Sequence, residues 1–174
     1  MQFPNTIETE RLILRPWRED DAEVCFRYAS DPRVGPPAGW KAHESAEESR
    51  EIIRTILSAD MVYAITLRGA DEPVGSVGLH PCSRPETIGH VELGYWVAVP
   101  FWGEGIAPEA GEALLKTAFD LGATEIWVRH NAENHRSRRV IKKLGFTFRF
   151  SDTERNEALG KEQEVWFYSL TRQA

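Results

Sequence analysis

Two glycines separated by one residue, Gly103 and Gly105, lie between a β-branched, aromatic stretch and the start of a helical pattern. The stretch before them, residues 90–99, is typical of a strand, and Pro100 ends it. Pro108 falls in the first turn of the expected helix, where a missing N–H costs nothing. Such a turn points successive backbone N–H groups and the positive end of the helix dipole into one concavity. The turn therefore predicts a site for a phosphate or pyrophosphate.

Three other interpretations of this turn can be compared with the sequence. A tight strand-to-helix connection that binds nothing needs the same glycines. A dinucleotide-binding fingerprint has a third glycine at position 108, where this chain has Pro108. A Walker A loop needs Gly-Lys followed by Ser or Thr, which the sequence lacks. The sequence thus weakens the two nucleotide-binding motifs and leaves the unliganded turn as the competing interpretation.

A cluster of positive charge is the second chemical feature, in a chain whose formal net charge is -6. Residues 134–146 contain the basic side chains of Arg136, Arg138, Arg139, Lys142 and Lys143. One interpretation is a solvated helix face. The other is charge that complements a polyanion bound at the neighbouring turn.

The sequence around the turn resembles the acetyl-CoA loop of the GNAT acetyltransferase superfamily, in particular the RimJ/RimL-type ribosomal-protein N-terminal acetyltransferases. The residues that carry the resemblance are Gly94-Tyr95-Trp96, then Trp102-Gly103-Glu104-Gly105-Ile106-Ala107, then Glu109-Ala110. Trp102 stands where the general superfamily pattern has Arg or Gln, and Glu104 stands where this branch often has Lys. Asn134-x-x-Ser137 followed by Lys143-Leu144-Gly145-Phe146 resembles the second motif of the superfamily.

The resemblance implies acetyl-CoA as the cofactor and assigns residues to it. The turn would hold the pyrophosphate, the basic segment would complement the 3′-phosphate, and the backbone of Val97 and Val99 would pair with the pantetheine amides like an added strand. Glu104 would have to point to solvent, because a carboxylate repels a pyrophosphate. The predicted cofactor-binding residues are Val97, Val99, Trp102, Gly103, Glu104, Gly105, Ile106, Ala107, Asn134, Ser137, Arg139 and Lys143.

Acetyl transfer to an amine requires a group that takes the amine proton, directly or through water. Glu92 is the predicted base, with His90 as runner-up on the same strand face; the alternative is that Glu92 only pairs with an arginine. The tetrahedral oxyanion needs an N–H donor, and the leaving thiolate benefits from an acid. Ser137 and Tyr95 compete for that role, and by resemblance to RimL-like enzymes Ser137 donates to the thioester sulfur. No Cys or Ser has the setting of a nucleophile, so the amine would attack directly in a ternary complex.

The loop at residues 34–43, between two expected helices, is a candidate acceptor lip. It contains Trp40 and His43, and by resemblance this region lines the acceptor side. Together with His90 these are the predicted substrate-binding residues. The alternative is that Trp40 simply covers the core.

The elements that must position these residues follow from periodicity and end signals. The predicted helices are residues 19–30, one opened by a capping box at Ser45 and Glu48, residues 107–121, and one capped at Asn134. Residues 80–87 are predicted to be a loop, and a right-handed βαβ unit should make the strands on either side of helix 107–121 parallel. The predicted strands are residues 8–15, 61–68, 74–79, 90–99, 125–129, 146–150 and 164–170.

This order, β-α-α-β-β-β-α-β-α-β-β, predicts a single α+β domain over residues 1–174. It has a mixed sheet of about seven strands with helices on both faces, which is also the GNAT order. The acidic balance argues against a nucleic-acid or membrane partner, and no stretch is long and apolar enough for a transmembrane helix. The N-terminus has no signal layout, and Cys25 and Cys82 suggest free thiols, so we expect a cytoplasmic monomer or homodimer without a metal.

The sequence thus predicts an acetyl-CoA-dependent N-acetyltransferase. By resemblance its acceptor is a protein or peptide N-terminal α-amine. The alternatives are a small-molecule amine such as a polyamine, amino acid or aminoglycoside, a non-catalytic acyl-CoA-binding regulatory module, and a nucleotide-binding phosphate loop.

Overall fold

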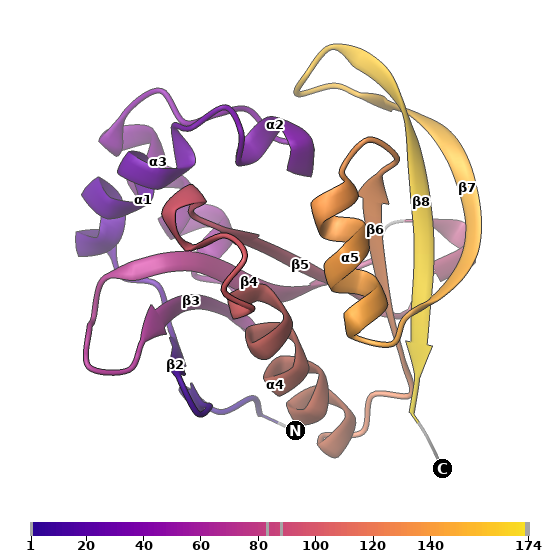
Figure 1. Ribbon diagram of the computed structural model, residues 1–174, viewed down its shortest axis with the longest axis horizontal. Helices are drawn as coiled ribbons and strands as arrows, with labels where there is room; N and C mark the ends of the chain where they lie inside the picture. The colour runs from indigo at the N-terminus through magenta and orange to yellow at the C-terminus, as the bar shows by residue number, and fades with distance from the viewer. Residues whose placement is uncertain (1, 83, 88, 173–174) are drawn as a thin grey trace.

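A computed structural model describes residues 2–82, 84–87 and 89–172 (Figure 1). In that part of the chain, eight strands form one sheet in the order β1-β2-β3-β4-β5-β6-β8-β7. Neighbouring strands are antiparallel except β5 and β6, which are parallel as predicted. The strands are β1 (Ile7–Glu8), β2 (Leu12–Arg15), β3 (Val62–Leu67), β4 (Pro73–Pro81), β5 (Val91–Val97), β6 (Glu125–Asn131), β7 (Thr147–Asn156) and β8 (Lys161–Thr171).

Helices cover both faces of this sheet, which confirms the predicted α+β class (Figure 1). The face with α4 and α5 is the opposite of the face with α1 and α3. The α-helices are α1 (Ala22–Ala29), α2 (Gly35–Ala38), α3 (Ala46–Ile52), α4 (Ile106–Asp120) and α5 (His135–Lys143). Shorter helical turns are η1 (Glu19–Asp21), the π-helical η2 (Ile53–Leu57), η3 (Pro85–Thr87) and η4 (Val99–Phe101).

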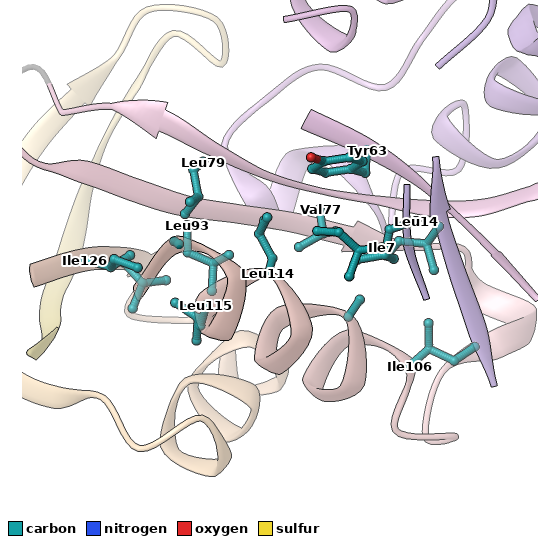
Figure 2. Close-up of a cluster of buried hydrophobic side chains, with 14 of the residues drawn as sticks. Ile7, Leu14, Tyr63, Val77, Leu79, Leu93, Ile106, Leu114, Leu115 and Ile126 are labelled. Carbon is teal, nitrogen blue, oxygen red and sulfur yellow. The ribbon is translucent and has the colours of Figure 1, made fainter. Parts of the chain in front are cut away.

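The larger core lies between α4 and the middle of the sheet (Figure 2). Leu93 and Ile126 from the parallel pair pack with Leu114 and Leu115 of α4. Ile106, the first residue of α4, is only 2% exposed. Because burial of such a side chain stabilises by about 1.5–3 kcal/mol, the N-terminus of α4 is anchored directly after the glycine turn.

Two predicted segments differ from the structure for local reasons. Residues 8–15 form two short antiparallel strands, β1 and β2, rather than one, because Thr9 makes a tight turn in which its Oγ1 accepts the N–H of Leu12 at 2.8 Å. The predicted loop at residues 34–43 contains the helix α2, which has Pro at its N-terminal positions and ends at Gly39 with φ +95°.

Strand ends are the other point of difference. β4 continues through His80 and Pro81, which the sequence analysis assigned to a loop. Position 83 of that predicted loop lies outside the described residues. β7 and β8 are longer than predicted, since their hairpin pairing continues to Asn156 and Lys161. The extension of β4 matters for the site, because it makes His80 a strand residue with a fixed orientation.

Candidate active site

The two parallel strands at the centre of the sheet separate along their length. β5 and β6 pair only at Val91 with Ile126 and at Glu92 with Trp127, and β5 then continues without β6 to Val97. Backbone groups alternate between the two sides of a strand. The N–H of Ala98 donates to Val74 on the β4 side, so the backbone groups of Val97 face the gap. A cavity of about 1190 Å³ occupies this opening.

The glycine turn lies at the end of the gap. Gly103 and Gly105 have φ of +82° and +78°, which side chains other than glycine rarely adopt, and Gly105 is the N-cap residue of α4. Both glycines line the cavity, as do Ile106 and Ala107. Glu104 is exposed and does not line it. The geometry is that of an anion site, with free N–H groups at a helix N-terminus.

An arginine near the N-terminus of the chain, Arg11, holds the glycine turn in place. Arg11 donates to the carbonyl oxygen of Glu104 at 2.9 Å and forms an ion pair with Glu109 at 2.6 Å. Glu109 also accepts a hydrogen bond from the hydroxyl of Thr9 at 2.6 Å. Arg11 is not among the sequence-predicted site residues, because nothing local to the β1–β2 turn indicates a partner about 100 residues away.

Helix α5 presents only part of its positive charge to the cavity. Arg136, Arg139 and Lys143 line it, whereas Arg138 stacks on Trp166 instead, with its guanidinium 4.5 Å from the ring centroid. Lys142 does not line the cavity either. Three basic side chains of the segment therefore face the cavity, and Arg138 packs against an aromatic ring instead.

Trp102 connects α5 to the open strand edge. The guanidinium of Arg136 lies 3.9 Å from the centre of a Trp102 ring, a cation–π contact. The indole Nε1 of Trp102 donates to the carbonyl oxygen of Val97 at 2.7 Å. The indole thus fixes a basic side chain beside the turn and occupies one of the acceptors on the strand edge.

Asn134 caps α5, as predicted. Its Oδ1 accepts the N–H of Ser137 at 3.1 Å, and its Nδ2 donates to the carbonyl oxygen of Pro37 at 3.1 Å. Asn131 donates to the same oxygen at 2.9 Å, and Asn156 donates to Gly39 at 2.8 Å. Three asparagine amides therefore tie α2 to β6, α5 and β7. Asn134 and the α2 residue Pro37 both line the cavity.

The two candidate acids are in contact with one another. The hydroxyl oxygens of Tyr95 and Ser137 lie 2.8 Å apart, so the pair forms a hydrogen bond across the gap between β5 and α5. Burial raises the pKa of Tyr95 well above its usual range, and the hydrogen bond with Ser137 only partly offsets this. Tyr95 is therefore protonated at neutral pH, and the linked hydroxyls of Tyr95 and Ser137 can together donate a hydrogen bond.

Glu92 projects from the other face of the sheet. Side chains alternate along β5, so Leu93 and Tyr95 face α4 and α5, whereas Glu92 and Trp96 face α1 and α3. The carboxylate of Glu92 accepts a hydrogen bond from Arg129 Nε at 3.1 Å. Burial raises the pKa of Glu92, and the positive charge of Arg129 opposes this rise. Glu92 thus has an arginine partner and also lines the cavity.

Arg129 belongs to a wider charge network on this face. Its Nη1 pairs with Glu154 on β7 at 3.0 Å, and Glu154 in turn contacts Arg84. Glu92 therefore lies at one end of a chain of alternating charges that reaches the edge of the sheet.

The predicted acceptor lip contributes two rings to the cavity. Trp40 lies 6.1 Å from Trp96 and 5.3 Å from His43, measured between ring centroids. Trp40 and His43 line the cavity, and the Nδ1 of His43 forms a hydrogen bond with Ser49 Oγ at 2.7 Å. Burial lowers the pKa of His43. Trp40 also packs against the smaller core, so this side chain both covers the core and lines the cavity.

Three sequence-predicted residues lie outside the cavity, namely Glu104, His90 and Val99. His90 comes before β5 and its Nε2 is 3.6 Å from Glu125. Val99 is in the turn η4, where its carbonyl oxygen accepts the N–H of Trp102, and it borders a separate small pocket. Sequence reasoning missed several cavity-lining residues, among them His80 and Arg129. The alternation of Ser76, Gly78 and His80 was the available signal, since these residues pair with Trp96, Gly94 and Glu92.

The fit of coenzyme A can be judged from these residues. The turn offers N–H groups for a pyrophosphate, α5 offers three cations for further phosphate, and the free edge of β5 offers amide partners for an extended chain. In the described part of the chain, no helix is long and apolar enough to cross a membrane, and no cluster of three or more His, Cys, Asp or Glu side chains has the arrangement of a metal site. The fold and site define an α+β domain whose cavity carries groups that suit coenzyme A.

Comparisons with known proteins agree with this class. The family model for the acetyltransferase (GNAT) domain matches residues 11–147. The chain is 27% identical over 173 residues to the uncharacterised N-acetyltransferase p20 of Bacillus licheniformis, covering 96% of each chain. It is 29% identical over 150 residues to the uncharacterised N-acetyltransferase YoaA of Bacillus subtilis, covering 83% of each.

Solved structures show the same fold. An acetyltransferase of the GNAT family from Bacillus anthracis superposes with a TM-score of 0.83 at 22% identity, covering 95% of this chain and 98% of that one. The ribosomal-protein-S5-alanine acetyltransferase from Vibrio fischeri gives a TM-score of 0.72 at 18% identity, covering 95% and 96%. The chain belongs to the GNAT acetyltransferase family, and it is an acyltransferase whose co-substrate is implied by that fold to be acetyl-CoA.

Proposed function

We propose that this enzyme transfers the acetyl group of acetyl-CoA to the α-amino group at the N-terminus of a protein or peptide. The observation that carries the proposal is the arrangement of chemical groups on the two faces of the sheet. Tyr95 and Ser137 approach the gap between β5 and β6 from the α5 side, and Glu92 approaches it from the opposite face. A donor for the leaving thiolate and an acceptor for the amine proton therefore flank one opening, as direct attack requires.

The residues proposed for acetyl-CoA are those of the turn, the open strand edge and α5. The N–H groups around Gly105 hold the pyrophosphate, and Arg139 and Lys143 provide charge for the remaining phosphate. The co-substrate supplies the acetyl thioester. The chain contributes the hydroxyl pair of Tyr95 and Ser137, which donates a hydrogen bond toward the sulfur, and Glu92, which takes a proton from the amine.

The polypeptide acceptor is supported by the motif resemblance and by the open acceptor side. The motifs of this chain resemble the RimJ/RimL-type branch, and one structure with the same fold is named for a ribosomal-protein substrate. The far end of the cavity is lined by α3, η2 and the β7–β8 hairpin, including Glu48, Ile56, Arg155 and Gln163. Ile56 is 52% exposed there, an apolar surface suited to a side chain near a peptide terminus.

A thiol-release assay with acetyl-CoA tests this proposal. We expect release with peptides that have a free N-terminus, and none with the same peptides blocked at the N-terminus but carrying an internal lysine. Release only with polyamines, amino acids or aminoglycosides contradicts the polypeptide acceptor. Coenzyme A binding without release on any amine favours a non-catalytic module, and thermal stabilisation by ATP or NAD rather than coenzyme A favours a nucleotide site.

A further inference from the structure

His80 lies directly across the β4–β5 pair from Glu92. The two residues are register partners, so their side chains project from the same face of the sheet. Both line the cavity, and so do their neighbours along the two strands, Gly94 and Trp96 on β5. A second group able to accept a proton therefore faces the acceptor side of the gap beside the proposed base.

The imidazole of His80 extends over Gly94. A Cβ placed on Gly94 would lie 3.3 Å from His80 Cδ2 and 3.4 Å from Nε2, closer than side chains normally approach. Because Gly94 has no side chain, the imidazole ring of His80 fits in the space between Glu92 and Trp96. Gly94 immediately precedes Tyr95, whose hydroxyl lies on the opposite side of the same opening. The imidazole of His80 therefore lies beside the gap, close to the point where Tyr95 reaches it from the opposite face of the sheet.

The chemical state of His80 suits proton transfer. Neither ring nitrogen has a hydrogen-bond partner within the described part of the chain, although the side chain is only partly exposed. Burial lowers the pKa of His80, so the ring is neutral near pH 7 and has a free lone pair. The carboxylate of Glu92 is instead engaged by Arg129. A neutral imidazole facing a cavity and lacking a structural partner is a group available to substrate.

We propose that His80 is a second proton acceptor for the amine, held over Gly94 and opposite Glu92. The acceptor arrives as an ammonium ion and loses two protons. Glu92 takes the first, which frees the lone pair that forms the C–N bond. His80 takes the second as that bond forms and the C–S bond breaks. The electron pair of the broken bond goes to sulfur, which takes up one proton, so the reaction releases one proton to water.

This inference rests on the proposed acetyl transfer, and variants of His80 test it on a peptide that the wild-type enzyme acetylates. We expect His80→Gln to lower kcat by roughly 100-fold and to leave KM for acetyl-CoA nearly unchanged. We expect added imidazole to restore part of the rate of His80→Ala in a saturable way. We expect Gly94→Ala, which displaces the ring without removing it, to lower kcat by about tenfold or more.

Controls separate this role from simple packing. His135→Gln changes an exposed histidine of α5 outside the cavity and should keep the wild-type rate with and without imidazole. Thiol release by imidazole without peptide is subtracted. A wild-type kcat in His80→Gln, or a loss in His80→Ala that imidazole does not reverse, overturns the inference while the acetyl transfer stands. Absence of thiol release by the wild-type enzyme on any amine overturns both.

Discussion

Replacement of Gly105 by valine should abolish coenzyme A binding while the protein stays folded. The residue has φ +78° at the N-cap of α4, and a β-branched side chain there forces the turn to rearrange. Each N–H that contacts a charged group contributes about 1.5–3 kcal/mol. Loss of two such contacts weakens affinity by roughly 100-fold or more. Titration calorimetry with coenzyme A measures this directly.

Gly69 provides a matched control for the strain itself. It has φ +86° in the turn between β3 and β4, with no atom within 4 Å of an added Cβ, and it does not line the cavity. Gly69→Val should lose a similar amount of stability in a thermal melt but bind coenzyme A like wild type. Equal affinity of Gly105→Val and Gly69→Val for coenzyme A would remove the turn from the site.

The second large effect is expected for Glu92→Gln, which should lower kcat at neutral pH by about 100-fold. The amide has the shape of the carboxylate but cannot take up the proton of an ammonium group. Arg129 keeps Glu154 as an ionic partner, so the local structure should persist. Steady-state kinetics with a peptide acceptor give kcat, and calorimetry should show unchanged affinity for coenzyme A.

Glu162→Gln is the corresponding control, because this carboxylate is exposed on β8 and outside the cavity. It changes the net charge of the protein by the same amount and should leave kcat unaltered. A wild-type rate in Glu92→Gln means that Glu92 is only the ionic partner of Arg129 and takes no part in the chemistry.

Local signals in the sequence were sufficient for the elements around the turn. The two glycines, the caps at Ser45 and Asn134 and the helix end at Gly122 depend on a few neighbouring residues, and the structure has each of them as predicted. Turn and cap residues adopt these conformations because of their own backbone preferences and their nearest hydrogen bonds. The position of the glycine turn and of the helix caps therefore follows from short stretches of sequence.

Contacts between distant segments could not be predicted in the same way. The Arg11–Glu109 pair and the opposition of His80 and Glu92 depend on strand register, which a single strand does not encode. The predicted strand ended at Leu79, whereas β4 continues through His80. The orientation of the His80 side chain was therefore not predicted. Periodicity placed His90 on the strand of Glu92, whereas β5 begins at Val91 and the His90 side chain meets Glu125 rather than the cavity.

We expect acetyl-CoA to bind in the gap between β5 and β6 and at the turn of residues 103–107. A crystal structure of the enzyme with coenzyme A tests this expectation most directly. We predict that the pyrophosphate accepts hydrogen bonds from the N–H groups of the turn, and that the thiol lies within reach of the Tyr95–Ser137 pair. Coenzyme A located elsewhere on the protein, or absent at saturating concentration, would contradict the account.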